Sequence, residues 1–231
     1  MPSTHKMGLI SKDKNMNTLQ VKEIFTSISG EIGTIPQGAM TVFIRFQGCN
    51  LRCAYCDTPH TQAKEGGEFL TVDAILSRIP KGFQNFILTG GEPLLQDQTP
   101  FQQLCKNLSA RGVVQVETNG TIIPNDLKNV DCWIFDYKFH SANKLNFEYF
   151  KHMDEHTRET APTIWLKFPI ETKDHCFKML SVIEKITIWN YRIKFAASPI
   201  GVSPDFLFQF IQKHCPCCVL NIQLHKKLGF N

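Results

Sequence analysis

Three closely spaced cysteines are the residues of this chain best suited to chemistry. Cys49, Cys53 and Cys56 form a CxxxCxxC pattern directly after the apolar stretch 41–46. Three thiolates on one short loop can each bind one iron of a 4Fe–4S cluster, and the fourth iron then has no protein ligand. An iron with an open position can bind a small molecule through an amine and a carboxylate. The ring of Tyr55, which precedes the third cysteine, could lie against a flat base.

Two other interpretations of these cysteines are open at this point. Zinc usually takes four ligands, often from two paired motifs. A zinc site on this loop would therefore need a fourth ligand, such as His60. The three cysteines could also be buried thiols that bind nothing. The spacing favours the iron–sulfur site.

The elements that must position this loop follow an alternating pattern. Short apolar strands are predicted at 19–25, 41–46, 85–89, 113–118, 132–136, 164–168, 191–196 and 219–224, and helices at 71–80, 98–111, 174–186 and after Ser203-Pro204, with a partly helical region at 143–160. About six βα units predict an α/β fold with a parallel sheet covered by helices. Polar residues follow several strands, and the carboxyl ends of parallel strands are where active sites assemble.

Composition limits the class of protein. The 231 residues are 42% hydrophobic and 20% charged, which predicts one folded domain at 19–231 after a flexible tail at 1–18. The net charge of +4 suits an anionic small substrate. No basic stripe with interleaved aromatics and no apolar stretch of about 20 residues is present, so neither nucleic acid nor membrane is an expected partner. Nine cysteines without a secretory signal predict reduced thiols in the cytoplasm.

A second motif extends the pattern beyond the cysteines. Gly90-Gly91-Glu92-Pro93 follows a predicted strand and resembles the GGE motif of the radical SAM superfamily, whose signature is CxxxCxxC with an aromatic residue before the last cysteine. The resemblance implies that a reduced 4Fe–4S cluster held by Cys49, Cys53 and Cys56 cleaves S-adenosylmethionine to methionine and a 5′-deoxyadenosyl radical. It also implies a partial or modified TIM-type (β/α)6 barrel.

Four further stretches resemble one family within that superfamily. They are 23–33, 43–51, 56–58 and 220–226, and they are similar to the 7-carboxy-7-deazaguanine synthases. The resemblance implies conversion of 6-carboxy-5,6,7,8-tetrahydropterin to 7-carboxy-7-deazaguanine with loss of ammonia, in the biosynthesis of queuosine and other 7-deazapurines. It further implies a homodimer, an external electron donor such as flavodoxin or ferredoxin, and Mg²⁺ bound by Thr58.

The resemblance also assigns residues to the two ligands. The pterin would be bound by Ile28, Ser29, Gly30, Glu31, Arg45, Thr89, His225 and the terminal residue Asn231. S-adenosylmethionine would be bound by Tyr55, Gly91, Glu92, Glu117, Asn119, Asp136, Tyr137, Lys138, Phe195, Ala196, Ala197 and Ser198. The chain departs from the family pattern at Ser29, where Gln is common, and at Asp136-Tyr137, where Ser-Pro is common.

Several of these residues also have simpler explanations. Thr58 could be a helix cap, and Arg45, Glu31 and His225 could be solvated polar residues. The stretch 215–218, which contains Cys215, Cys217 and Cys218, is predicted to be a turn with small apolar thiols. The alternative is that these cysteines bind a second iron–sulfur cluster or zinc. Cys105, Cys132 and Cys176 read as core residues.

Two rival functions follow from the same motifs. A glycyl-radical-enzyme activase shares the cysteine and GGE motifs but acts on a protein. A non-enzymatic iron–sulfur or zinc binding module would need only the cysteines.

Overall fold

The computed structural model describes residues 17–126, 128–140, 162–187 and 193–230. The first strand begins at Thr18, at the end of the predicted tail, and residues 1–16 of that tail lie outside the described part. The predicted partly helical region at 143–160 also lies outside it.

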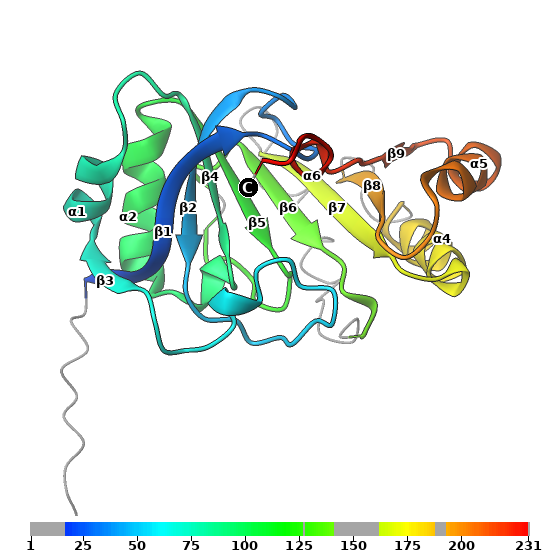
Figure 1. Cartoon of the computed structure of the whole chain (residues 1–231), viewed down its shortest axis with the longest axis horizontal. Helices are drawn as coiled ribbons and strands as arrows, with labels where there is room; N and C mark the ends of the chain where they lie inside the picture. Colours follow the sequence, from blue (N-terminus) through cyan, green and yellow to red (C-terminus); the bar gives the residue numbers. More distant parts are fainter. Residues whose placement is uncertain (1–16, 127, 141–161, 188–192, 231) are drawn as a thin grey trace, which may run out of the picture.

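A nine-stranded sheet forms the centre of the molecule (Figure 1). Its order is β3-β1-β2-β4-β5-β6-β7-β8-β9, so β3 and β9 occupy its two edges and the sheet is open. Strand β1 is antiparallel to β2 and β3, whereas β2 and β4 to β9 run parallel. The strands are β1 (Thr18–Ile28), β2 (Met40–Phe46), β3 (Glu68–Thr71), β4 (Asn85–Gly90), β5 (Val113–Thr118), β6 (Cys132–Asp136), β7 (Thr163–Ile170), β8 (Ile193–Pro199) and β9 (Cys218–Leu220). This confirms the predicted α/β fold with a largely parallel sheet.

The helices begin where the sequence places capping residues. They are α1 (Val72–Arg78), α2 (Gln98–Ser109), α4 (Lys173–Thr187), α5 (Pro204–His214) and α6 (Leu224–Leu228), with 3-10 turns η1 (Pro59–Thr61) and η2 (Pro93–Leu95). The hydroxyl of Thr71 accepts from the Ala74 backbone N–H at the start of α1. Ser203 caps α5 in the same way, with Pro204 in the first turn. These side chains satisfy backbone donors that a helix start leaves unpaired.

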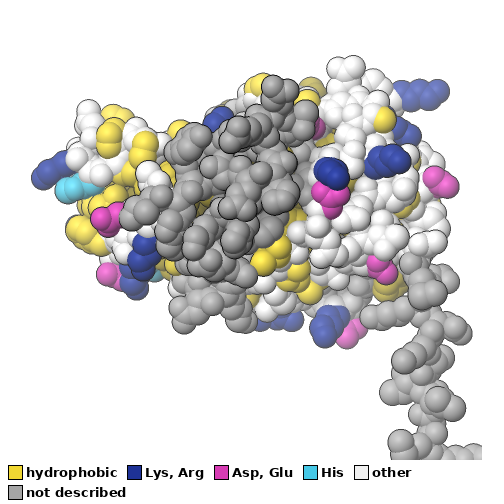
Figure 2. All heavy atoms as spheres, turned by 180° about the vertical axis from the view of Figure 1, so that it is seen from behind, with side chains coloured by type: hydrophobic (Ala, Val, Ile, Leu, Met, Phe, Trp, Pro, Cys, Tyr) yellow, Lys and Arg dark blue, Asp and Glu magenta, His cyan; other side chains and the backbone are white. Residues whose placement is uncertain are grey.

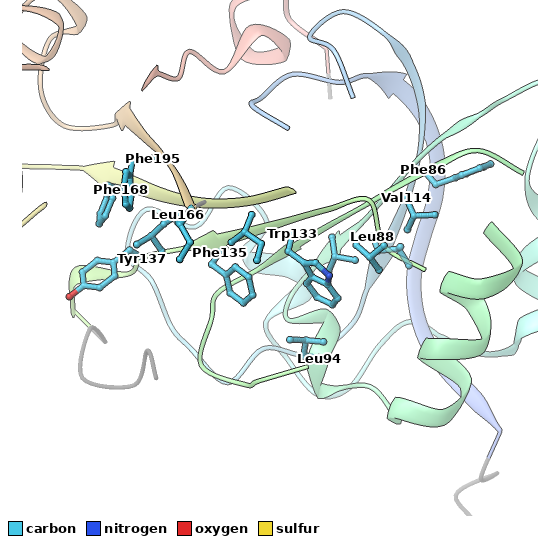
Figure 3. Packing of buried hydrophobic residues seen from close by; sticks show 14 of the residues in the cluster. Phe86, Leu88, Leu94, Val114, Trp133, Phe135, Tyr137, Leu166, Phe168 and Phe195 are labelled. Atoms are coloured by element: carbon cyan, nitrogen blue, oxygen red, sulfur yellow. The ribbon is translucent and has the colours of Figure 1, made fainter. Parts of the chain in front are cut away.

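Alternation along each parallel strand separates an apolar face from a polar one. Figure 3 shows buried side chains of the apolar face from Phe86 and Val114 through Trp133 and Phe135 to Leu166 and Phe168. Helices α1, α2, α4 and α5 each contribute buried residues to the same layer. This packing fixes the register of every strand, because a slip by one residue would exchange the two faces.

The alternate positions of the strands form the second face, where the polar residues lie. This face carries Arg45 on β2, Thr89 on β4, Glu117 on β5, Asp136 on β6 and Lys167 on β7. The loop between β1 and β2 reaches the same face, since Ile32 packs with Cys132, Ile134 and Ala196. The fold thus gathers four charged side chains and one hydroxyl on the same face of five neighbouring strands.

Two elements differ from the sequence prediction. Strand β3 was not predicted, because its four residues carry a single buried side chain, Leu70, and the strand exists through its pairing with β1. The predicted strand 219–224 is wrong in length. It is a three-residue strand, and the chain leaves the sheet after Asn221, whose backbone N–H still donates to the Ala197 carbonyl, and enters α6.

Candidate active site

The cysteine loop, residues 49–58, is tied to the glycine-rich turn after β4. The backbone N–H of Glu92 donates to the Gly48 carbonyl at 2.8 Å, and that of Gly91 donates to Phe46 at 3.0 Å. A Cβ at Gly91 would lie 2.1 Å from the Gly48 carbonyl oxygen, so only glycine permits this approach. The two motifs recognised separately in the sequence are therefore one piece of structure.

The three thiols of the loop share a partly buried environment. Cys49, Cys53 and Cys56 are each intermediate in exposure. Burial raises the pKa of Cys53, Lys138 lowers it, and the neighbouring Cys49 and Cys56 raise it further. The Leu51 backbone N–H lies 3.4 Å from the Cys49 sulfur and the ring of His140 lies 3.2 Å from that of Cys53. Hydrogen bonds to the cysteine sulfurs tune iron–sulfur clusters, and the Leu51 N–H is a donor of this kind, so the loop fits such a group.

The zinc alternative finds no support in the geometry. His60 lies 3.8 Å from Glu23. Within the described ranges, no three His, Cys, Asp or Glu side chains converge as ligands of a single metal ion. A 4Fe–4S cluster makes a different demand, because each thiolate binds its own iron. Thr58 precedes η1 but makes no capping hydrogen bond with its side chain, and its hydroxyl lies 3.8 Å from the Cys56 sulfur.

Glu92 is fully buried, and its carboxylate links its own turn to the end of β5. Its carboxylate accepts from Leu94 N–H at 2.9 Å, from the Thr118 hydroxyl at 2.7 Å and from Asn119 N–H at 2.8 Å. The Asn119 side chain in turn lies 3.8 Å from the Cys49 sulfur. Glu92 thus places the end of β5 against the cysteine loop, and its predicted contact with S-adenosylmethionine stays a prediction.

The sequence only partly predicted a charged cluster formed by Lys167 within β7, residues 136–138 at the end of β6, and Glu31. The Lys167 ammonium contacts Glu31 Oε2 and lies 3.1 Å from Asp136 Oδ1, while Lys138 lies 2.8 Å from Asp136 Oδ2. Side-chain exposure is 9% for Lys167 and 12% for Glu31, so the solvated-acid explanation of Glu31 is wrong. Lys167 carries no motif, and the only sequence signal was a lone lysine inside an apolar strand.

Glu31 and Glu117 respond oppositely to this cluster. Burial raises the pKa of Glu31, but Lys167 and Gln223 outweigh it and bring the pKa to about 2. Burial and the charge of Glu31 raise the pKa of Glu117 to about 7. The Thr89 hydroxyl donates to Glu117 at 3.0 Å. The site therefore holds one carboxylate ionised and a second that can take a proton near neutrality.

Arg45 is not the exposed strand residue that the sequence allowed. Its side chain is 15% exposed, its Nε lies 2.7 Å from Glu23 Oε1, and its guanidinium lies over the Phe25 ring. Glu23 faces it directly across the β1–β2 pair. One carboxylate cannot satisfy all five guanidinium donors, so the side chain can bind a second anion.

The C-terminal arm, residues 218–230, closes the site from the far end of the chain. Gln223 donates to Glu31 Oε1 at 2.5 Å and Asn221 donates to Oε2 at 3.3 Å. The Leu224 N–H donates to the Gly30 carbonyl at 2.8 Å, and a Cβ at Gly30 would collide with the His225 ring at 1.9 Å. The structure therefore brings Gly30, Glu31 and His225 together, with His225 in the first turn of α6.

Comparison with known proteins identifies the chain. Residues 43–161 match the radical SAM superfamily. The chain is 32% identical over 215 residues to the 7-carboxy-7-deazaguanine synthase of Clostridium acetobutylicum, which covers 90% of this chain and 94% of that protein. The chain belongs to the 7-carboxy-7-deazaguanine synthase family. The synthase of Methanospirillum hungatei is 30% identical, over 91% of this chain and 86% of that one.

A solved structure supports the fold independently. QueE from Escherichia coli superposes with a TM-score of 0.71 at 20% identity, over 90% of this chain and 95% of that chain. Family membership implies a 4Fe–4S cluster and S-adenosylmethionine. It also favours a synthase over the glycyl-radical-enzyme activase and over the non-enzymatic binding module. No described helix is both long and apolar enough to cross a membrane.

The residues predicted to hold S-adenosylmethionine do not all lie on the polar face. Tyr137, Phe195 and Ala197 pack in the apolar layer, so they could offer a ligand mainly backbone groups. Ala196 and Ser198 lie on the polar face, where the Ser198 hydroxyl accepts from Asn221 at 2.8 Å. Ser29 is buried, and its hydroxyl donates to the Ile35 carbonyl at 3.4 Å. Asn231 lies outside the described residues.

The remaining cysteines lie where the sequence predicted a turn and core positions. Cys215 and Cys217 lie in the turn between α5 and β9, with 3.4 Å between their sulfurs, and Cys218 is the first residue of β9. Cys105, Cys132 and Cys176 are buried. All nine cysteines lie in the described part of the chain and all are free.

Proposed function

We propose that the chain converts 6-carboxy-5,6,7,8-tetrahydropterin into 7-carboxy-7-deazaguanine with loss of ammonia, as a step of queuosine or related 7-deazapurine biosynthesis. The observation that carries the proposal is the 32% identity with a synthase over nearly the whole length of both chains. The convergence of Glu31, Lys167 and the C-terminal arm on one polar face adds a site of suitable charge.

On the cofactor side, Cys49, Cys53 and Cys56 would hold the cluster, which supplies radical chemistry when it is bound with S-adenosylmethionine. The buried Glu92 keeps the glycine turn and Asn119 against the cysteine loop. The Tyr55 ring is partly buried beside Lys138, with the ammonium 5.4 Å from the ring centre. These side chains are therefore held in place before the cofactor binds, so binding costs little conformational entropy.

On the substrate side, Glu31 and Arg45 have complementary tasks. The Glu31 carboxylate is an acceptor for the N–H donors at the guanidine-like edge of a pterin. The Arg45 guanidinium suits the substrate carboxylate, because a planar fork can bind a carboxylate through two parallel hydrogen bonds. His225 lies against Gly30 at the same end of the site, and burial lowers its pKa, which favours the neutral ring.

The proposal also includes a bound Mg²⁺ ion, an external electron donor, a homodimer and a cytoplasmic location. The Thr58 hydroxyl is a hard oxygen ligand of the kind that Mg²⁺ accepts, and Mg²⁺ usually takes its other ligands from substrate and water. A flavodoxin or ferredoxin would reduce the cluster. Nine free thiols favour the reducing cytoplasm.

An anaerobic assay tests the proposal. Protein reconstituted with iron and sulfide would be reduced and mixed with S-adenosylmethionine and the carboxypterin. We expect a brown protein, methionine, 5′-deoxyadenosine and 7-carboxy-7-deazaguanine, without any added protein substrate. A colourless protein, or consumption of S-adenosylmethionine with no pterin product, would contradict the proposal.

The proposed role of Thr58 as a Mg²⁺ ligand is tested by running the same assay with and without Mg²⁺. Wild type should respond to added Mg²⁺, whereas Thr58→Val, which keeps the shape and removes the hydroxyl, should respond much less. The matched control is Thr26→Val, because Thr26 is an exposed threonine of β1 that lies outside the proposed ion site. An equal response of all three proteins would exclude the assigned role.

A further inference from the structure

Lys167 is a buried cation at the centre of the polar face. Strand β7 places it between Asp136 on β6 and Ala196 on β8. Its ammonium contacts Glu31 Oε2 and lies 3.1 Å from Asp136 Oδ1. A lysine this deep is retained only where charged partners compensate for the lost water. Its partners here are residues that the family resemblance assigns to the substrate and to S-adenosylmethionine.

We propose that Lys167 is a positioning residue that fixes and neutralises the Glu31 carboxylate, so that the site selects a neutral hydrogen-bond-donor edge, as in a pterin or guanine-type base, over a cationic guanidinium. The proposal deepens the proposed function and rests on it. It concerns how the site recognises the substrate, and it assigns Lys167 no contact with the reacting atoms.

The contacts around Glu31 fix the position of the carboxylate. Oε2 faces Lys167 and also accepts from Asn221 at 3.3 Å, while Oε1 accepts from Gln223 at 2.5 Å. Partners on both oxygens leave little freedom of rotation. An ion pair with Lys167 also removes the net charge that would otherwise attract a cationic ligand.

The Lys167 ammonium contacts one residue assigned to the pterin, Glu31, and one assigned to S-adenosylmethionine, Asp136. Asp136 binds Lys167 through Oδ1 and Lys138 through Oδ2, at 3.1 and 2.8 Å. Without the Lys167 charge, Asp136 keeps an ammonium partner, whereas the contacts above leave Glu31 with two neutral amides. Loss of Lys167 should therefore harm pterin binding more than binding of S-adenosylmethionine.

The charge of Lys167 also predicts a specific pH effect. The charged and titratable groups that face Glu31 are Lys167 on β7, Asp57 in the cysteine loop, Glu117 on β5 and His225 on α6. With Lys167 present, the pKa of Glu31 is about 2 and the carboxylate stays ionised at working pH. Without it, burial and Asp57 raise this pKa, so Glu31 gains a proton as the pH falls and loses its role as a pure acceptor.

The test compares Lys167→Met with Lys167→Arg and with the control Lys194→Met. Lys194 lies on the neighbouring strand with its ammonium over the Trp165 ring, so the same substitution there removes one lysine from outside the cluster. For reconstituted protein we expect Lys167→Met to raise the KM and the calorimetric Kd for the pterin by about 10- to 100-fold, because it leaves a buried charge unpaired. The KM for S-adenosylmethionine should change by less than about threefold.

The pH profile separates positioning from a merely structural role. The pterin Kd of wild type, Lys167→Arg and Lys194→Met should vary little between acidic and neutral buffer, whereas that of Lys167→Met should worsen as the pH falls. Equal and pH-independent binding by wild type and Lys167→Met, with wild-type turnover intact, would overturn this proposal and leave the proposed function standing. A wild type that neither binds nor converts the pterin would overturn both.

A double variant guards against misfolding. If Lys167 acts through Glu31, then Lys167→Met combined with Glu31→Gln should bind the pterin about as weakly as Glu31→Gln alone. Effects that simply multiply would contradict the proposal. Should Lys167→Met fail to retain its cluster or a cooperative melting transition, the double variant, which buries no unpaired carboxylate at Glu31, carries the comparison with Glu31→Gln.

Discussion

The cysteine loop and the charged cluster around Lys167 meet in one site but are built differently. Among the described residues, the hydrogen-bond contacts to the sulfurs of Cys49, Cys53 and Cys56 are long, at 3.2 to 3.8 Å. Lys167 and Glu31, by contrast, are paired and largely buried without any ligand. The thiols of the loop are therefore available as ligands of an iron–sulfur cluster. The charged residues around Lys167 are instead already held in position by one another.

The difference shows where each kind of information lies in the chain. The loop is local, so its three cysteines and the adjacent glycine turn can be recognised from spacing alone. The charged cluster brings together residue 31, residues 136–138, residue 167 and residues 221–223, and only the sheet topology makes them neighbours. Mutations should therefore separate cofactor loading from substrate recognition.

The largest expected effect comes from a cysteine of the loop. Cys53→Ser should abolish the visible absorbance of the cluster and lower product formation by more than about 100-fold, since even outer partners of metal ligands contribute 10- to 100-fold. The unreconstituted protein should unfold with a free energy within about 1 kcal/mol of wild type, because Cys53 is only partly buried. Cys217→Ser, at an exposed cysteine, is the control and should keep the cluster. Retained activity in Cys53→Ser would contradict the assignment.

Asn221→Ala should affect the charged cluster and leave the loop intact. Its side chain accepts from Ile32 N–H at 3.0 Å and donates to Ser198 and Glu31, and it is 1% exposed. Loss of these buried bonds should lower the free energy of unfolding by about 1–3 kcal/mol and raise the KM for the pterin. Cluster absorbance should not change. Loss of the iron–sulfur cluster in this variant would contradict the separation of cofactor binding from substrate binding.

Glu117→Gln should change the pH dependence of stability. The folded-state pKa of Glu117 is about 7, against 4.5 ordinarily, so the folded protein holds a proton that the unfolded chain releases between these values. Stability from this group therefore falls as the pH rises from 4.5 to 7. Glu117→Gln should be more stable than wild type by about 1–3 kcal/mol at pH 8, with a smaller or no gain near pH 4.5. Denaturation at both pH values measures this, and an equal difference at both would refute the shift.

The smallest effect is expected outside both regions. Thr71→Ala removes the cap of α1, where the hydroxyl accepts from Ala74 N–H at 3.2 Å. It should cost about 1 kcal/mol of unfolding free energy and leave both the cluster absorbance and the pterin KM unchanged. A change in KM would mean that general loss of stability alone alters substrate binding.

Local patterns predicted most of the fold, and long-range contacts explain what was missed. The parallel strands and the caps at Thr71 and Ser203 follow from apolar runs and capping residues. Strand β3 exists through its partner, and the predicted strand at 219–224 ends early because Asn221 and Gln223 turn toward Glu31. Lys167 was missed because its meaning depends on Glu31 and Asp136, which are distant in sequence.

Hydrogen transfer tests the central claim most directly, because it requires both regions to act on one substrate. Carboxypterin carrying deuterium at C6 would be turned over with S-adenosylmethionine by the reduced, reconstituted protein. If the charged cluster holds the pterin beside the cofactor of the cysteine loop, the label should appear in 5′-deoxyadenosine as 7-carboxy-7-deazaguanine accumulates. Product formed together with unlabelled 5′-deoxyadenosine would contradict the account.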